Sequence, residues 1–205
     1  MDRLVSRLEK NGYLKSPDVI RAFLSIRRED FVLPEYKGEA DEDIALPIGY
    51  GQTISQPLTV AFMLELLAPK AGQKILDVGS GSGWTTTLIA HIVGRGGKVI
   101  GIERNEDLKK FGEENAKKYE EVTKEVARFI LGDGSKGYPE DSPYDRILVS
   151  AAADCVPNDL KDQLKIGGKI VIPIEGSIWM MEKAGENRFE KEEYPGFILV
   201  PLVEG

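Results

Sequence analysis

The sequence reads Leu76-Asp77-Val78-Gly79-Ser80-Gly81-Ser82-Gly83-Trp84 where an apolar stretch gives way to a helical pattern. The pattern predicts a strand over residues 74–78 and a helix over residues 85–93, with the glycines in the turn between them. Glycines there permit a tight turn and let a ligand approach the backbone closely. A dinucleotide-binding loop would need glycine at position 84, where this chain carries tryptophan, so the segment indicates a different cofactor.

The acidic residue before the first glycine narrows the choice of cofactor. Asp77 lies two residues upstream of Gly79, where a carboxylate suits a cationic ligand better than a pyrophosphate. S-adenosylmethionine carries an α-ammonium group and a sulfonium, and a carboxylate attracts the ammonium directly or through water. In the alternative interpretation Asp77 is an ordinary turn residue and the glycines serve packing alone. The predicted cofactor loop comprises Gly79, Ser80, Gly81, Ser82 and Gly83.

Two further acidic residues follow the next predicted strands. Glu103 comes after residues 98–102, where a carboxylate can accept both hydroxyls of a ribose; the alternative is a surface salt bridge with Arg104. Asp133 and Gly134 follow the third strand, where the carboxylate can receive an adenine amino group and the Gly134 backbone can donate nearby. Because the carboxyl ends of parallel strands form the ligand-binding edge of an open α/β sheet, we expect these groups to meet the glycine loop there.

Strands and helices alternate along most of the chain. This predicts an α/β fold, with a Rossmann-like, doubly wound, mostly parallel sheet and helices on both faces. The predicted strands span 74–78, 98–102, 127–131, 145–150 and 169–174, the last after a turn at Gly167-Gly168, and helices start near Pro17, Pro57, Thr85, Asn105 and Asn158. Residues 178–183 and 197–202 are predicted strands, separated by a charged turn, that form an antiparallel edge.

We interpret residues 1–205 as a single domain in three parts. Residues 1–56 form an N-terminal helical and loop extension over the site, residues 57–175 the cofactor-binding core, and residues 176–205 the C-terminal strands. Ser16 is the expected N-cap of the helix that begins at Pro17. The acidic run at residues 39–43 is interpreted as a solvated loop.

Composition excludes several functional classes. The chain of 205 residues has a net charge of −7, which argues against broad nucleic-acid binding because phosphate contacts need clustered Lys and Arg. The single cysteine, Cys155, and the single histidine, His91, offer no metal-ligand set and no internal disulfide. The first residues lack an apolar signal region, and no apolar run reaches the roughly 18 residues of a membrane helix. We expect a cytoplasmic monomer without metal.

Two segments outside the glycine loop carry a family resemblance. GYGQTISQP at residues 49–57 resembles the signature upstream of the glycine loop in protein-L-isoaspartate O-methyltransferases. PYDRILVSAAA at 143–153 is similar to their later strand motif, and QLKIGGK at 163–169 and VPLV at 200–203 continue the likeness. Order and spacing agree over residues 1–205. The chain departs from the family at Leu58, at Trp84 and over residues 176–196, which concerns the peptide-binding rim.

The resemblance implies repair of damaged proteins. Enzymes of this family methylate the free α-carboxylate of L-isoaspartyl residues in proteins and peptides, using S-adenosyl-L-methionine and releasing S-adenosyl-L-homocysteine. The ester then closes to a succinimide, which can reopen to normal aspartate. By resemblance Ser55 is the active-site residue that contacts the carboxylate. The other residues that it assigns are Gln52, Thr53 and Ile54 beside the substrate and Ser82, Glu103, Asp133 and Gly134 beside the cofactor.

This chemistry needs no catalytic base. An α-carboxylate with a pKa of about 3.5 is already ionised at neutral pH, so catalysis can rest on positioning. Ser55 precedes the helix expected near Pro57, where its hydroxyl and the backbone N–H groups can hold an anion; alternatively Ser55 only caps the helix. Two other functions remain open: a related methyltransferase for a small molecule or tRNA, and a non-catalytic nucleotide-binding module.

Overall fold

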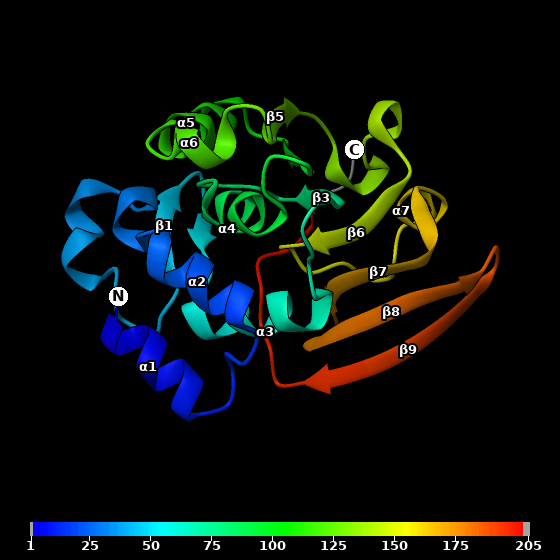
Figure 1. Ribbon diagram of the computed structural model, residues 1–205, viewed down its shortest axis with the longest axis horizontal. Coiled ribbons are helices and arrows are strands. Elements are labelled where there is room, and N and C mark those ends of the chain that lie inside the picture. Colours follow the sequence, from blue (N-terminus) through cyan, green and yellow to red (C-terminus); the bar gives the residue numbers. More distant parts are fainter. Residues whose placement is uncertain (1, 203–205) are drawn as a thin grey trace.

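The central sheet lies within residues 2–202, which are the residues described by the computed structural model. Its seven strands lie in the order β5-β4-β3-β6-β7-β8-β9, with β3 to β7 parallel and β8 and β9 antiparallel to their neighbours (Figure 1). The strands are β3 Lys74–Val78, β4 Lys98–Glu103, β5 Ala127–Leu131, β6 Tyr144–Val149, β7 Leu164–Ile174, β8 Ser177–Gly185 and β9 Arg188–Pro195. The chain builds outward from β3 through β4 and β5, then returns to place β6 on the other side. Ligands bind at such a reversal of strand order, at the carboxyl ends of the strands.

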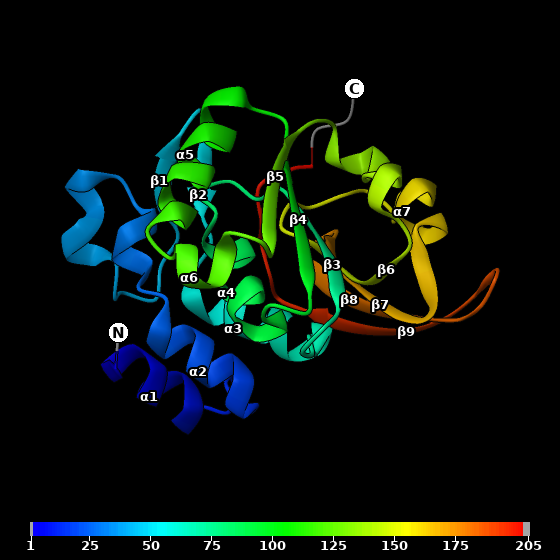
Figure 2. The ribbon, with the colours of Figure 1, turned by 45° about the horizontal axis from the view of Figure 1, so that its top comes forward.

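Neighbouring residues of the parallel strands face two separate apolar clusters. Ile75 and Val99 belong to a large cluster with the N-terminal helices, whereas Leu76 and Ile100 belong to a second cluster that includes Leu160 of α7. Successive side chains of a strand point to opposite faces, so a sheet covered on both sides needs apolar residues at both. Figure 2 shows α3 to α6 on one side and α7 on the other. The predicted α/β fold with helices on both faces is confirmed.

Five helices begin within one residue of their predicted starts, whereas the first and the sixth helix were given no predicted start. The helices are α1 Asp2–Lys10, α2 Pro17–Ser25, α3 Pro57–Leu67, α4 Trp84–Val93, α5 Glu106–Lys117, α6 Glu120–Thr123 and α7 Asn158–Asp162. Asn105 caps α5, because its side chain accepts the N–H groups of Asp107 and Leu108. Ser16 occupies the N-cap of α2, yet its hydroxyl donates to Glu65 at 2.7 Å instead of capping the helix. Within residues 2–202, none of the helices combines the length and the apolar content required to cross a bilayer.

The segment between α2 and α3 contains structure that the sequence analysis left as loop. Two 3-10 helices, η1 Arg28–Phe31 and η2 Pro34–Glu39, precede an antiparallel hairpin of β1 Leu46–Gly49 and β2 Gln52–Ile54. Three consecutive residues at its turn, 49–51, have positive φ, which glycine tolerates and Tyr50 adopts at 53°. Strands of four and three residues are too short to show a periodic pattern.

The start of β7 corrects one prediction. The strand begins at Leu164, so Gly167-Gly168 lies within it and does not form a turn before it. The pairing with β6 is irregular here: an advance of two positions along β6, from Tyr144 to Arg146, corresponds to an advance of five along β7, from Leu164 to Lys169. A local bulge of this kind accommodates glycine in a strand.

The C-terminal edge is antiparallel, as expected, but one of its strands was misplaced. Residues 197–202 do not form a sheet strand; β9 is the charged segment Arg188–Pro195, which was predicted to be a turn. An exposed edge strand tolerates charge, so β9 lacks the apolar signal of a buried strand. The chain after β9 returns to the carboxyl ends of the parallel strands, where Ala152 and Pro201 form a bridge. Val203 of the VPLV motif lies outside the described residues.

Candidate functional site

The glycine loop turns at the carboxyl end of β3. Gly79, Gly81 and Gly83 all have positive φ, at 79°, 49° and 84°. The N–H groups of Gly79 and Ser80 donate to the Ile102 carbonyl of β4 at 2.9 and 3.1 Å. Because L side chains rarely adopt this backbone, glycine at these positions fixes the path of the loop.

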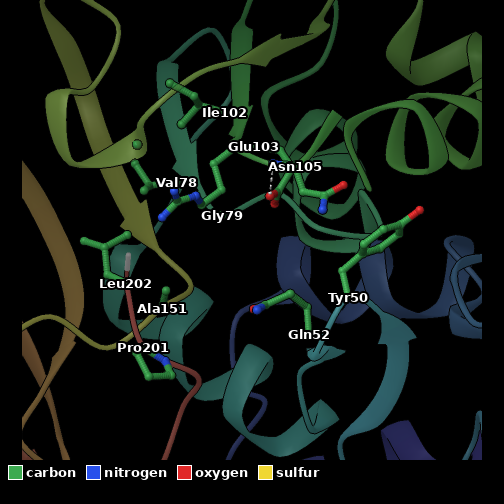
Figure 3. A pocket seen from close by; sticks show the side chains of 12 residues that line it. Tyr50, Gln52, Val78, Gly79, Ile102, Glu103, Asn105, Ala151, Pro201 and Leu202 are labelled. Atoms are coloured by element: carbon green, nitrogen blue, oxygen red, sulfur yellow. Dashed lines mark hydrogen bonds between the residues drawn. The ribbon is translucent and has the colours of Figure 1, made fainter. Parts of the chain in front are cut away.

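Two adjoining cavities lie beside this loop. The larger, about 290 Å³, is shown in Figure 3 and is lined by Tyr50, Gln52, Val78, Gly79, Ile102, Glu103, Arg104, Asn105, Gly134, Ala151, Pro201 and Leu202. The smaller, about 60 Å³, is lined by Ile48, Gln52, Thr53, Ile54, Ser55, Gly79, Ser80, Gly81, Ser82, Trp84, Thr85, Glu103, Ser150, Ala151 and Val200. They share Gln52, Gly79, Glu103 and Ala151, so they form one cleft. The structure thus brings the predicted substrate segment and the glycine loop together.

Glu103 is held rigidly at the wall of this cleft. Its side chain is 7% exposed, and one of its carboxylate oxygens accepts the Gly81 N–H at 3.0 Å. The other accepts the Asn105 N–H at 3.0 Å (Figure 3). Each carboxylate oxygen has further acceptor capacity, so Glu103 can also accept ligand hydroxyls. The two backbone donors orient the carboxylate before any ligand arrives.

Asp77 lies beneath the loop and outside the lining of the cleft. It is fully buried, accepts the Thr86 hydroxyl at 2.6 Å on one oxygen, and has no partner for Oδ1 within the described chain. Burial raises the pKa of Asp77 to about 6; the charge of Glu103 also raises the pKa, whereas the hydroxyl of Thr86 and the nearby Ser150 lower it. The negative charge of ionised Asp77 therefore attracts a cation in the cleft from behind the glycine loop.

The third acidic position is already engaged with its own turn. Asp133 caps the 3-10 helix η3 Gly134–Lys136, because its Oδ1 accepts the backbone N–H and the hydroxyl of Ser135 at 3.0 and 2.7 Å. Gly134 lines the cleft, whereas Asp133 does not. A Cβ at Gly134 would lie 2.5 Å from Val78, so only glycine brings this backbone so close to β3.

The substrate segment leads directly into α3. The N-cap residue of α3 is Gln56, whose own side chain does not cap the helix, so the structure gives no support to Ser55 as the cap. The Leu58 N–H donates to Asp43 at 2.8 Å. The acidic run at 39–43 is therefore not only a solvated loop. Asp43 binds a backbone N–H at the N-terminus of α3, a donor that the sequence analysis had assigned to a substrate anion.

Several residues of the cleft were not named from the sequence. Tyr50, at the turn of the hairpin, lines the larger cavity and donates to Asp107 of α5 at 2.6 Å. Tyr50 and Ala151 fall inside the quoted motifs, which were the available signal. Pro201 and Leu202 could not be placed at the cleft, because that segment was predicted to be a sheet strand.

These features define a class of protein. A parallel sheet with an antiparallel end, a glycine loop after β3 and an acidic residue at the end of β4 are the architecture of Rossmann-like methyltransferases. The family model for protein-L-isoaspartate(D-aspartate) O-methyltransferase matches residues 1–205, and the chain belongs to this family. The family, and with it the class of enzyme, is as predicted from the sequence.

Named relatives agree with this assignment. Protein-L-isoaspartate O-methyltransferases of Methanopyrus kandleri and Thermococcus sibiricus are 43% and 44% identical to the chain, over 98% of it and 90% and 92% of their own lengths. Among solved structures, one from Plasmodium falciparum assigned to the same activity superposes with a TM-score of 0.88 at 27% identity, covering 99% of this chain and 98% of its own. That structure is a complex with S-adenosyl-L-homocysteine.

The close approach of the glycine loop to α5 yields a first prediction. A Cβ at Gly112 would lie 2.6 Å from the Gly81 carbonyl oxygen. Gly112→Ala should therefore displace the loop, lowering the free energy of unfolding by about 1–3 kcal/mol and weakening S-adenosyl-L-homocysteine binding, although alanine favours helices by about 1 kcal/mol. Thermal denaturation and calorimetric titration measure both effects. The control is Gly96→Ala, whose Cβ would meet nothing closer than 3.8 Å; equal behaviour of the two variants would contradict the account.

The buried Asp77 predicts a pH-dependent stability. Because its pKa is raised from 3.8 to about 6, the folded state keeps a proton that the unfolded state has released in this interval, and stability falls as pH rises through it. Asp77→Asn should be relatively more thermostable above pH 6 than below pH 4, while binding S-adenosyl-L-homocysteine more weakly. Melting temperatures of variant and wild type across pH 4–8 measure this.

Asp145 supplies a control of opposite sign. Burial raises its pKa, but hydrogen bonds from Lys165 and from the Lys74 N–H outweigh this, and the pKa is lowered. Asp145→Asn should therefore lose stability relative to wild type at neutral pH and lose less in acid. A stability difference for Asp77→Asn that does not change with pH would show that its charge is not penalised by burial.

Proposed function

We propose that this protein transfers the methyl group of S-adenosylmethionine to the free α-carboxylate of L-isoaspartyl residues in damaged proteins and peptides. One observation carries the proposal: Ser55 and the glycine loop line the same cleft. The family assignment supports the reaction. The methyl ester then closes spontaneously to a succinimide, which begins the repair.

The residues of the cleft fit the cofactor. Glu103 would hold the ribose hydroxyls, the backbone of Gly134 would approach the adenine, and the glycine loop would lie along the methionine part, with the charge of Asp77 beneath it favouring the ammonium group. Apolar side chains of Val78 and Ile102 line the larger cavity beside these polar groups. When bound, the cofactor supplies an activated methyl group on a sulfonium.

The substrate carboxylate would bind where two cavities meet. Thr53 and Ser55 line the smaller cavity beside the glycine loop and also a further one of about 250 Å³, completed by Ala45, Gln56, Thr59, Ile198, Leu199 and Val200. We propose that the peptide lies in this further cavity and that the Ser55 hydroxyl donates to the carboxylate. Gln52, Thr53 and Ile54 would complete the wall. Since the carboxylate is ionised at neutral pH, the chain needs only to orient it and exclude water.

The proposal also covers the domain organisation and the oligomeric state of the chain. Residues 1–205 would act as one domain, in which the hairpin of the N-terminal part supplies the substrate segment. A net charge of −7 favours a protein substrate over tRNA. We propose that the chain acts as a monomer, since Ser55 and the glycine loop that line the cleft belong to the same chain.

The direct test compares two peptides that differ only in the isoaspartyl linkage. With radiolabelled S-adenosylmethionine, the isoaspartyl peptide should release labelled methanol, whereas the matching aspartyl peptide should release almost none. The reason is geometric: only the isoaspartyl linkage leaves an α-carboxylate free beside the chain. Equal release from both peptides, or none from either, would reject this substrate.

A reciprocal pair of variants separates the two halves of the site. Ser55→Ala removes one hydrogen bond to a charged group, worth about 1.5–3 kcal/mol, so kcat/KM for the isoaspartyl peptide should fall by roughly 10–100-fold with S-adenosyl-L-homocysteine affinity retained. Glu103→Gln should instead weaken S-adenosyl-L-homocysteine. Ser6→Ala, which changes an exposed residue of α1, is the control. Near-wild-type turnover by Ser55→Ala would remove this residue from the mechanism.

A further inference from the structure

Arg28 is a buried cation whose hydrogen bonds all end on the main chain. Its side chain is 0% exposed. Nη1 donates to the carbonyls of Ala40 and Glu42 at 3.0 and 3.3 Å. Nη2 donates to the carbonyls of Ile44 and Ser55 at 2.8 and 3.1 Å and lies 3.5 Å from that of Ile54. Removing a guanidinium from solvent costs free energy, so we expect the buried Arg28 to have a role that offsets this cost.

The carbonyls that Arg28 binds flank the hairpin on both sides. Those of residues 40–44 precede β1, and those of Ile54 and Ser55 belong to the last residue of β2 and the one after it. One planar group therefore clamps the two ends of the segment that carries the substrate residues. Lysine cannot reproduce this arrangement, because an ammonium has three donors at a single point whereas a guanidinium has five in a rigid plane.

The same guanidinium also contacts the cofactor side of the cleft. It lies over the Trp84 ring, 5.5 Å from the centroid. Trp84 is the first residue of α4 after the glycine loop and lines the smaller cavity together with Ser55. Arg28 thus connects the carboxylate segment to the helix that follows the cofactor loop.

Electrostatics at this point favour an anionic substrate. Burial lowers the pKa of Arg28 to about 10, with Asp43 and Asp41 opposing the shift, so the group stays charged at neutral pH. Its positive charge lies one hydrogen bond from the Ser55 backbone. In a poorly solvated region this charge attracts a carboxylate bound at the Ser55 side chain.

We propose that Arg28 is the positioning residue of the carboxylate site, holding the Ile54–Ser55 backbone so that the Ser55 hydroxyl faces the methyl donor. The inference rests on the proposed function for its kinetic consequences. It assigns to a residue of the N-terminal part, distant in sequence from the cleft, a share in substrate orientation.

Arg28→Lys is the informative variant, since it keeps the charge and loses the clamp. We expect kcat/KM for the isoaspartyl peptide to fall by roughly 10–100-fold while the Kd of S-adenosyl-L-homocysteine changes by less than about threefold. Arg146→Lys is the matched control, because Arg146 is also buried and donates to two carbonyls, of Leu67 and Asp145, away from the cleft. It should leave kcat/KM within about threefold.

A double-mutant cycle distinguishes positioning from general destabilisation. If Arg28 acts through Ser55, the effect of Arg28→Lys should largely disappear in the Ser55→Ala background, whereas a structural defect would multiply with it. Full additivity in the cycle would overturn the proposal. So would a loss of S-adenosyl-L-homocysteine affinity as large as the loss of kcat/KM, or an equal loss of kcat/KM in Arg146→Lys.

Hydrogen exchange tests the same idea without catalysis. In Arg28→Lys the amides of residues 52–56 should exchange faster than in wild type, while those of residues 79–85 should not. In Arg146→Lys the amides of residues 52–56 should exchange as in wild type. Unchanged exchange at 52–56 would overturn the proposal. If wild type fails to methylate the isoaspartyl peptide, the proposed function is rejected, and the exchange result still decides the role of Arg28.

Discussion

The site depends on one close contact between backbones, where the glycine loop passes against α5. A Cβ at Gly83 would lie 2.6 Å from the Gly112 carbonyl oxygen, and a Cβ at Gly112 the same distance from that of Gly81. Without side chains at these positions the loop lies low enough for the Gly81 N–H to reach Glu103. The Asn115 side chain, one turn further along α5, donates to the Ser82 carbonyl at 3.1 Å and holds the loop there. Steric contact thus fixes this wall of the cleft first, and hydrogen bonds hold it second.

Charge is divided across the cleft in a way that suits two ligands of opposite sign. Asp77 and Glu103 are buried on the side of the glycine loop, where a cation is expected. Arg28 is buried behind the substrate segment, where a carboxylate is expected. Burying each of these charged groups costs free energy in the free protein. A bound ligand of opposite charge would offset part of that cost. The buried charges therefore lower the stability of the free protein and raise its affinity for the two ligands.

The sequence predicted best where local chemistry decides the structure. The strands β3 and β5 were placed at their observed bounds, because each is a short run rich in apolar residues that ends immediately before a glycine. The positions of Glu103 and Gly134 at the cleft followed from the rule that ligands bind at the carboxyl ends of parallel strands. Prediction failed for β9 and for residues 197–202, where exposure and long-range pairing outweigh local preference. The apolar residues 197–202 were predicted to be a strand, whereas the charged β9 forms the edge of the sheet.

Arg28 shows why sequence reasoning missed part of the site. In the sequence it stands beside Arg27 in a charged run, a pattern that predicts a solvated surface. Only the fold reveals that Arg27 is exposed while Arg28 is buried against five carbonyls that come from residues 12 to 27 positions away. No local pattern encodes such convergence, because carbonyl groups are present at every residue. The partners of a buried charge show where it can act, and here two of those partners belong to the segment that lines the cleft together with the glycine loop.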